Sequence, residues 1–523
     1  MRHTRAACRR VLAVAHTVTS TVRLLEALEL LHGDDRVEVF FTEIDGASFP
    51  RGVTRLIEEV DGLLIPWRDA ARAPFHLAVA TGSSGPLHQL NAPLLSLAHG
   101  LGYNKLLVPD GQAKPDPQGE AYGLARRQLL HDGAVVPSLL GVSHSEQIGR
   151  LKQDCPEAAD RALLVGDLSF DRLTASLPWR DAYRAALGVA EHQTLVVVSS
   201  TWGSSSLLDE HPKLPLELLR QLPSDEFRIA LVVHPNVTAR HGGWNLRSWY
   251  ADAVRAGLIV IPRRAGWHGA VVAADLIVGD HGSVTLYGAC LDRPVLLAGF
   301  DAAAIVPDTA MARLGATSSR LDPRRPLRPQ LDRVRRHGHL RADAVETPGA
   351  AASAVRAAMY RLMDLPEPGT PAYSTAAPVT SPEDGPGVTA RLVTGELVDG
   401  ACRVERFPVS ADVADPQLVV EDTEPNPGIV GLAESLVRRG HGPTSALPPD
   451  AVFARHPGCR RLVDLAGPAP VVHLRDGRAL ALGGDADPVL AAAVLRLLPD
   501  PPGRITVVTG RRSTTLQMTP IRS

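Results

Sequence analysis

Short apolar segments alternate with helical segments over the first 365 residues, and this alternation constrains the fold more than any other feature of the chain. The first series contains VLAVAH, VEVFF, GLLIP and PLLSLAHG; the second begins at ALLVGD (162–167) and continues through TLVVVSSTWG, IALVVHP, GLIVIP, DLIVGDHGS and PVLLAGF. Strands that are apolar on both faces and separated by helices are typical of a parallel, doubly wound sheet. The sequence therefore predicts an α/β protein with two Rossmann-like domains facing a cleft, over residues 1–160 and 161–365.

Two further regions follow the second series. Residues 366–386 are rich in Pro, Gly, Ser and Thr, which is typical of a linker because such a segment has little apolar surface to bury. Residues 387–523 combine four β-like runs with two expected helices, near 428–438 and 487–497. We expect a small accessory α+β domain there, and we find no catalytic motif in it.

The charge balance argues against nucleic acid as a partner. Lys and Arg number 55 against 57 Asp and Glu, a formal net charge of -2, so no overall field attracts a polyanion. The five cysteines are isolated from one another, which predicts buried thiols in a reducing compartment and no structural zinc. The apolar run Val11–Ala15 is too short for a signal peptide or a membrane span, so we expect a cytoplasmic protein, with peripheral membrane association left open.

The loops after the strands are where a ligand should bind, because open α/β sheets bind ligands beyond the carboxyl ends of their strands. The segment after DLIVG resembles a phosphate cradle: a glycine permits close approach, the next helix offers free amides, and two hydroxyls can donate. Its expected donor-binding residues are Asp280, His281, Gly282, Ser283, Val284 and Thr285. The alternative is that Ser283 only caps the helix.

Histidines end several of the predicted strands. His99 is followed by Gly100 and Gly102, and its ordinary pKa suits a general base that activates a hydroxyl, so it is the expected catalytic residue. His234 is expected beside the donor diphosphate, and His16 on the acceptor side with Gly100. Thr201 belongs to a hydroxyl-rich loop suited to a ribose or phosphate. In each case the alternative is a side chain bonded only to its own loop.

The order of these motifs resembles the CDP-glycerol glycerophosphotransferase family, the teichoic-acid polymerases and primases, over about residues 95–300. The matching segments are LAHGLGYNK (97–105), VGDLSFDRL (165–173), VVVSSTWGSS (196–205), LVVHPN (231–236) and AADLIVGDHGSVTLYGACLDRPVLLAG (273–299). The resemblance implies a glycosyltransferase-B fold and adds Lys105 to the acceptor side. The chain departs from the family at 279–283, where GDHGS replaces the usual Ser-Asp-Tyr-Ser-Ser.

Together these features predict a transferase of cell wall polymer biosynthesis type. It would use a nucleotide-diphosphate-activated donor, CDP-glycerol, CDP-ribitol or a nucleotide sugar, and a hydroxyl acceptor, either free or membrane-associated. Histidine assistance and amide contacts to the diphosphate would require neither a metal nor another cofactor. Two alternatives remain: a catalytically inert sensor or scaffold of the same fold, and a nucleotide-sugar 2-epimerase, which depends on clustered acidic residues.

Overall fold

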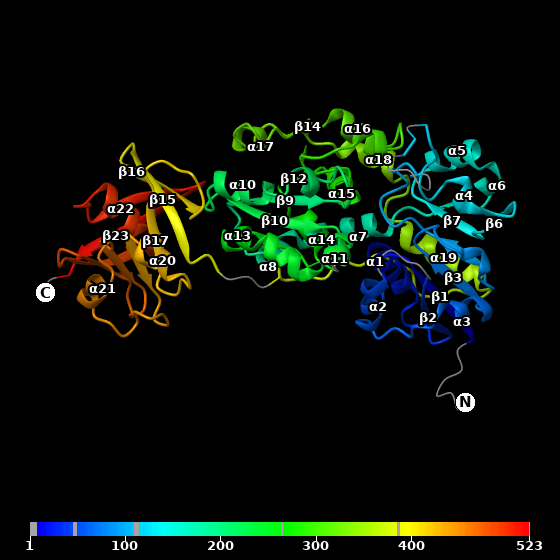
Figure 1. The fold of residues 1–523 in the computed structure, drawn as a ribbon, viewed down its shortest axis with the longest axis horizontal. Coiled ribbons are helices and arrows are strands. Elements are labelled where there is room, and N and C mark those ends of the chain that lie inside the picture. Colours follow the sequence, from blue (N-terminus) through cyan, green and yellow to red (C-terminus); the bar gives the residue numbers. More distant parts are fainter. Residues whose placement is uncertain are drawn as a thin grey trace, which may run out of the picture.

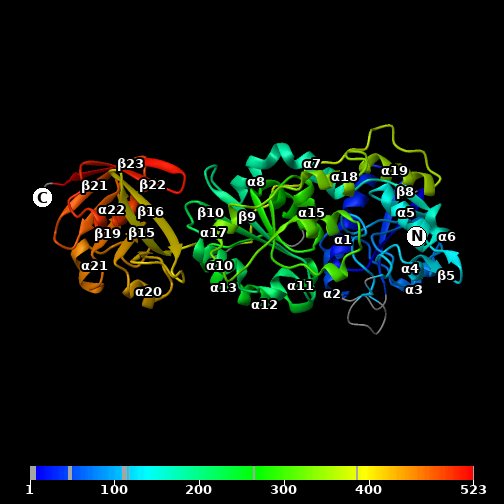
Figure 2. The same ribbon diagram turned by 90° about the horizontal axis from the view of Figure 1, so that it is seen from above.

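The computed structural model describes residues 8–44, 50–108, 115–116, 118–262, 265–383 and 387–521. Three bodies lie in a row: an N-terminal α/β domain, a second α/β domain in the middle, and a barrel at the C-terminal end (Figures 1 and 2). None of the helices within the described ranges is long and apolar enough to cross a membrane.

The first domain is built on a six-stranded parallel sheet in the order β2-β1-β3-β4-β7-β8. Its strands are β1 (Arg9–Ala15), β2 (Val37–Glu43), β3 (Leu77–Ala80), β4 (Leu94–Ser96), β7 (Leu139–Val142) and β8 (Ala162–Leu164), and a small hairpin is formed by β5 (Leu130–His131) and β6 (Ala134–Val135). Its helices are α1 (Val18–Leu28), α2 (Pro50–Glu58), α3 (Trp67–Arg72), α4 (Arg126–Leu129), α5 (Ser145–Asp154) and α6 (Pro156–Ala159).

The second domain has another six-stranded parallel sheet, in the order β11-β10-β9-β12-β13-β14. Its strands are β9 (Thr194–Ser200), β10 (Phe227–Val233), β11 (Ile259–Val260), β12 (Leu276–Gly279), β13 (Val295–Leu297) and β14 (Ser319–Arg320). The helices after β8 are α7 (Leu168–Ser176), α8 (Arg180–Ala186), α9 (Leu207–Glu210), α10 (Leu214–Gln221), α11 (Pro235–His241), α12 (Gly243–Trp249), α13 (Ala251–Arg255), α14 (Trp267–Ala273), α15 (Ser283–Cys290), α16 (Ala310–Thr317), α17 (Arg328–Leu331), α18 (Arg341–Ala344) and α19 (Ala351–Leu362).

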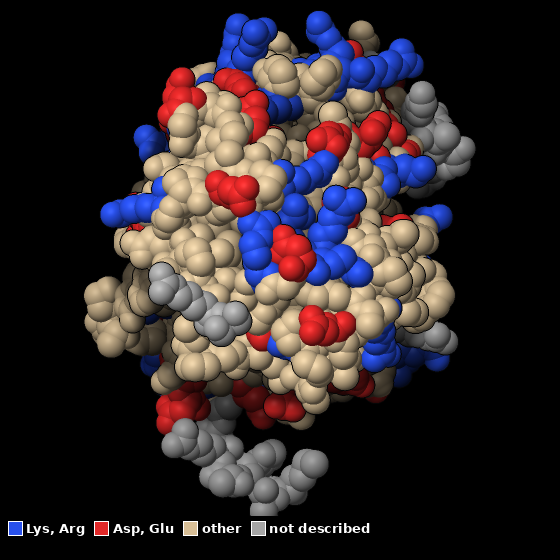
Figure 3. Space-filling model, turned by 90° about the vertical axis from the view of Figure 1, so that its left-hand side faces the viewer, with Lys and Arg blue, Asp and Glu red and all other residues tan. Residues whose placement is uncertain are grey.

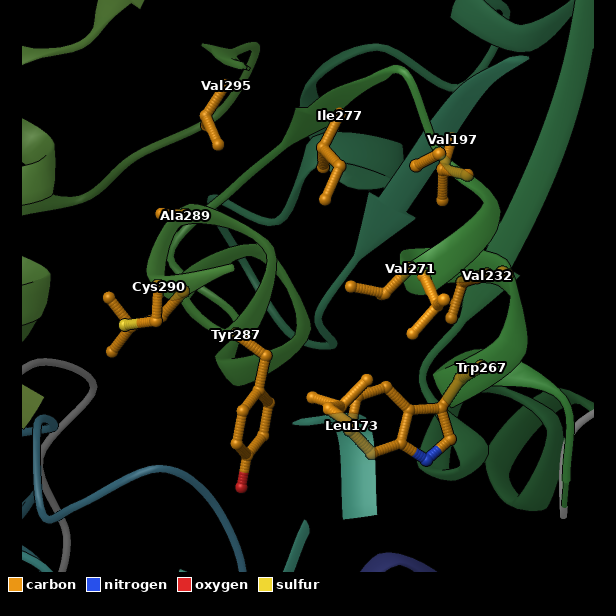
Figure 4. Packing of buried hydrophobic residues seen from close by; sticks show 14 of the residues in the cluster. Leu173, Val197, Val232, Trp267, Val271, Ile277, Tyr287, Ala289, Cys290 and Val295 are labelled. Atoms are coloured by element: carbon orange, nitrogen blue, oxygen red, sulfur yellow. The ribbon is translucent and has the colours of Figure 1, made fainter. Parts of the chain in front are cut away.

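The central strand β9 shows why an uninterrupted apolar run folds this way. Leu195 and Val197 point to one face of the sheet and pack with α14 and α15, while Val196 and Val198 point to the other face and pack with α10. All four side chains are fully buried. Figure 4 shows the first of these clusters, in which Val197 lies near Val271 and Ile277. Helices on both faces therefore fix β9 as an interior strand, as the sequence predicted.

The boundary between the two α/β domains differs from the predicted one at residue 160. Strand β8, which the sequence assigned to the second series, pairs with β7 and forms the edge of the first sheet. Helix α19 also returns to the first domain, where Val355 and Met359 join its core and the Tyr360 hydroxyl donates to Asp34 at 2.7 Å. The first domain therefore includes β8 and α19, although both lie after residue 160 in the sequence.

The C-terminal region is a closed nine-stranded barrel, so the expectation of a small α+β domain is wrong. Strands β15 and β17 pair and close it, and the predicted helix near 428–438 ends early because Ser435–Arg438 forms a buried strand. The strands are β15 (Ala390–Val398), β16 (Ala401–Pro408), β17 (Gln417–Glu421), β18 (Ser435–Arg438), β19 (Arg461–Asp464), β20 (Val471–Leu474), β21 (Ala479–Gly484), β22 (Arg504–Thr509) and β23 (Arg512–Pro520); the helices are α20 (Pro427–Gly431), α21 (Pro449–Arg455) and α22 (Ala491–Leu497).

The segment before the barrel has no helix or strand in its described part, as expected of a linker, yet it is attached to the second domain. The backbone N–H of Ala377 donates to Ser176 at 2.9 Å, and the Tyr183 hydroxyl donates to the Ala377 carbonyl at 2.6 Å. The N–H of Glu383 donates to the carbonyl of Val260 at 3.0 Å. Hydrogen bonds of its backbone therefore attach this segment to the second domain.

Candidate active site

A cavity of about 670 Å³ lies between the first and second domains. Its walls come from the loops after β1, β3 and β4 on one side and after β9, β10, β11 and β12 on the other. Every one of these loops follows the carboxyl end of a parallel strand, which is where the sequence placed the ligand. Of the predicted site residues, ten line this cavity: His16, His99, Gly100, Lys105, Thr201, His234, His281, Gly282, Ser283 and Val284.

The start of α15 presents unoccupied hydrogen-bond donors to the cavity. Gly282 is the N-cap and no side chain caps the helix, so Ser283 does not have the capping role considered as an alternative. The amides of Ser283 and Val284 have no acceptor among the described residues. Free amides at a helix start favour an anion.

Gly100 brings the two domains into contact at this point. A Cβ atom at Gly100 would lie only 2.4 Å from the Ser283 Oγ and 3.3 Å from its Cβ. The loop after β4 therefore approaches the start of α15 so closely that only glycine fits without a shift of Ser283. The sequence placed Gly100 beside the acceptor and Ser283 beside the donor, and the structure makes them neighbours.

Two predicted donor-binding residues, Asp280 and Thr285, do not line the cavity. Asp280 is fully buried behind the loop, where its carboxylate accepts the N–H groups of Thr201 at 2.8 Å, Leu207 at 2.9 Å and Gly282 at 2.9 Å. Thr285 is also fully buried, against the backbone of Gly279. Asp280 thus holds the loops after β9 and β12 together and turns its charge away from the cavity.

His99 and His281 face the cavity as neutral imidazoles. Burial, together with the nearby Lys105 ammonium, lowers the pKa of His99 to about 4. Burial and Lys105 also lower the pKa of His281 to about 3. His99 lies edge-on to the ring of Tyr122, with ring centroids 5.9 Å apart. Near pH 7, His99 is therefore unprotonated and able to accept a proton.

The other two histidines are held by hydrogen bonds. The Nε2 of His16 donates to the carbonyl oxygen of Ser84 at 2.8 Å, and burial lowers the pKa of His16 to about 4. His234 accepts the N–H of Asn236 at its Nδ1, 3.2 Å away. Its Nε2 therefore carries the proton and donates to the Thr19 hydroxyl at 3.3 Å, which joins the second domain to the first.

The charge of the cavity wall is positive. Lys105 donates to the Thr201 hydroxyl at 3.4 Å, which again joins the two domains, and burial lowers its pKa. Arg23 also lines the cavity. None of the described lining residues is an aspartate or a glutamate. In the described part of the chain, no group of three or more His, Cys, Asp or Glu side chains is placed to hold a metal ion.

Sequence reasoning missed a buried network beneath the cavity. The Arg23 guanidinium lies over the rings of Trp267 and Tyr287, at 4.6 and 5.7 Å from their centroids, and pairs with Glu26 at 3.0 Å. The Tyr287 hydroxyl donates to Asp167 at 2.9 Å, and burial raises the pKa of Asp167 to about 6. Arg23 and Glu26, three residues apart in an otherwise buried helix, were the signal for it.

No family model and no curated protein match the sequence. A structure of the wall teichoic acid polymerase TagF soaked with CDPG is similar to this chain at 12% identity and a TM-score of 0.43, covering 68% of this chain and 88% of that one. UDP-GlcNAc 2-epimerase from Neisseria meningitidis, bound to UDP-GlcNAc, has 12% identity and a TM-score of 0.35, covering 55% and 82%.

A glycosyltransferase from Rickettsia africae has 11% identity and a TM-score of 0.34, covering 68% of this chain and 93% of that one. All three structures are similar to this chain at 11–12% identity and with TM-scores below 0.5.

Proposed function

We propose that this chain is a transferase that binds a nucleotide-diphosphate-activated donor and a hydroxyl acceptor in the cavity between its two α/β domains. The observation that carries the proposal is the composition of the wall: cations, hydroxyls and free helix amides, with no carboxylate among the described lining residues. Such a wall attracts a diphosphate and offers it donors on several sides. A nucleotide-sugar 2-epimerase, which depends on clustered acidic residues, is less consistent with it.

The donor is proposed to lie on the second domain. Amides of Ser283 and Val284 and the hydroxyl of Thr201 would donate to the diphosphate, and Lys105 would balance its charge. Gly282 lets the phosphates approach the backbone, and His234 and His281 complete this side of the site. These groups would stabilise the nucleotide as it leaves, which is where negative charge develops.

The acceptor is proposed to lie on the first domain, near His16 and Gly100. His99 would take the proton of the acceptor hydroxyl while that oxygen attacks the donor. The new bond joins the acceptor oxygen to the sugar carbon of a nucleotide sugar, or to the distal phosphorus of a CDP-glycerol-like donor. The bond to the departing nucleotide phosphate breaks at the same centre, and the nucleotide leaves with the electron pair.

The His99→Ala variant tests this assignment. We expect turnover to fall by about 10²–10⁴-fold while donor affinity stays nearly unchanged, because a general base acts in the transition state. Donor affinity by calorimetry and the melting temperature are measured on the same preparations. Full turnover in the variant would contradict the role of His99. Donor binding without transfer to any acceptor, in the parent protein, would favour an inert sensor or scaffold.

A further inference from the structure

A second cavity, of about 420 Å³, lies between the second α/β domain and the barrel. Residues at the amino ends of β9 and β10 line one side, and β15, β16 and β23 line the other. It therefore lies at the opposite edge of the second sheet from the active cavity, and the two cavities have no lining residue in common. The barrel and the second domain are neighbours in both ribbon views (Figures 1 and 2).

Ion pairs engage three carboxylates of this cavity, and the pair of Arg406 with Asp225 crosses the interface. Arg406 of the barrel pairs with Asp225 of the second domain at 2.5 Å and with Asp487 at 2.7 Å. Glu421 pairs with Arg439 at 3.0 Å. Three of the four acidic residues that line the cavity are thus engaged by arginines of the barrel, and the fourth, Asp485, accepts the N–H of Thr515 at 2.7 Å.

Two further arginines of this cavity have no such partner. Neither Arg228 nor Arg391 forms a hydrogen bond or an ion pair with any described residue, and the Nε of Arg228 is completely buried. Burial lowers the pKa of both guanidinium groups. A half-buried cation without an ion-pair partner costs free energy, part of which a bound anion would recover.

Charges of both signs lie on the outer surface of the barrel and in the lining of this cavity. On the barrel end of the molecule, acidic and basic side chains are interspersed (Figure 3). Inside the cavity, apolar side chains including Leu219, Ile229 and Val489 complete the wall. The cavity lining therefore combines five arginines and four acidic residues with an apolar surface, and its volume is within the range of small-molecule sites.

We propose that this cavity is a second ligand site, which binds a small phosphorylated organic molecule through Arg228 and Arg391. The planar guanidinium group presents paired N–H donors that match two phosphate oxygens, and both arginines are free to do so. The organic part of the ligand would rest on Leu219, Ile229 and Val489. Because this site is separate from the active cavity, the proposal does not depend on the proposed transfer reaction.

Calorimetry on the full chain with a hexose phosphate, inorganic phosphate and citrate tests the proposal. We expect the hexose phosphate to bind, inorganic phosphate to bind more weakly, and citrate not to compete. Arg228→Met and Arg391→Met should each weaken binding of the hexose phosphate by about tenfold or more, since each removes charge-assisted hydrogen bonds to the phosphate. Arg496→Met is the matched control, because Arg496 is a barrel arginine outside this cavity that is paired with Asp415.

The Arg228→Met and Arg391→Met variants should also keep the melting temperature of the parent, because neither substitution removes a hydrogen bond within the protein. The His99→Ala variant should bind the hexose phosphate as the parent does, which separates this site from the active cavity. Failure of the parent to bind the hexose phosphate, or equal binding by the folded Arg228→Met and Arg391→Met variants, would overturn the proposal. If inorganic phosphate bound as tightly as the hexose phosphate, the apolar wall would contribute nothing to binding, and that part of the proposal would be wrong.

Discussion

Binding of a nucleotide-diphosphate ester in the active cavity should be accompanied by proton uptake. In the free protein, burial and Lys105 lower the pKa of His99 to about 4. A phosphate charge at roughly 5 Å, with an effective dielectric constant of about 20, stabilises the imidazolium by about 3 kcal/mol, which raises a pKa by about two units. In the complex, the pKa of His99 should therefore be about 6.

The sign and the size of the effect follow from these two pKa values. The complex holds the proton of His99 more tightly than the free protein does. Proton uptake is therefore greatest midway between the two pKa values, at about pH 5, where about 0.8 proton is taken up per complex formed. Uptake should be nearly absent above about pH 8. Affinity for the donor should fall by up to about 100-fold as the pH rises through the same interval, if His99 alone is responsible.

Calorimetry in two buffers of different ionisation enthalpy measures this uptake. A UDP-sugar is the suitable ligand, because its esterified diphosphate does not itself titrate in this range. His99→Gln should lose most of the uptake, while His456→Gln, a substitution in the barrel, should retain it. If the binding enthalpy at about pH 5 is the same in both buffers, no proton is taken up. This result would refute the reasoning, because it would mean that the phosphates do not bind close enough to His99 to raise its pKa.

Two further predictions concern the loops around the active cavity. Asp280→Asn should lower the free energy of unfolding by about 2–4 kcal/mol in chemical denaturation, because an amide cannot accept all three N–H groups that the carboxylate accepts; a loss below about 1 kcal/mol would contradict the tethering role. Gly100→Ala should weaken donor binding by about threefold to tenfold, as Ser283→Ala does, because its Cβ displaces the Ser283 hydroxyl. The double variant should be no weaker than Ser283→Ala alone, and additive losses would show that the two positions act separately.

Sequence reasoning succeeded where the signal was local. Strands β1, β9 and β12 contain the uninterrupted apolar runs Val11–Ala15, Leu195–Val198 and Leu276–Val278, which predicted interior strands whose following loops meet at one edge of a sheet. This is why ten of the predicted site residues line one cavity. The same argument could not assign β8, because a three-residue strand carries no mark of which sheet it joins.

The barrel was missed because only four β-like runs were recognised in the sequence where the structure has nine strands. In β23, the sequence RSTTLQMTP has only three buried positions, and these are separated by polar residues. Strand β18 was read as part of a helix, since its four residues follow α20 directly along the chain. Closure of the barrel depends on pairs distant in sequence, such as β16 with β22, and these pairs also create the second cavity. No local pattern at Arg228 or Arg391 could show that both would lie without a carboxylate partner.

The orientation of the Asp280 carboxylate determines whether its negative charge faces the active cavity. A carboxylate facing the cavity would repel a diphosphate, yet the sequence places an aspartate directly at the end of β12. The carboxylate is instead turned back onto the amide of Gly282, two residues later, a short-range bond that aspartate before glycine commonly makes. The sequence Asp280-His281-Gly282 is therefore one from which this hydrogen bond could have been predicted. Because the same carboxylate also accepts the amides of Thr201 and Leu207, its inward position is fixed by two loops. The cavity therefore presents only donors and cations at this point, and a diphosphate there would meet no opposing charge.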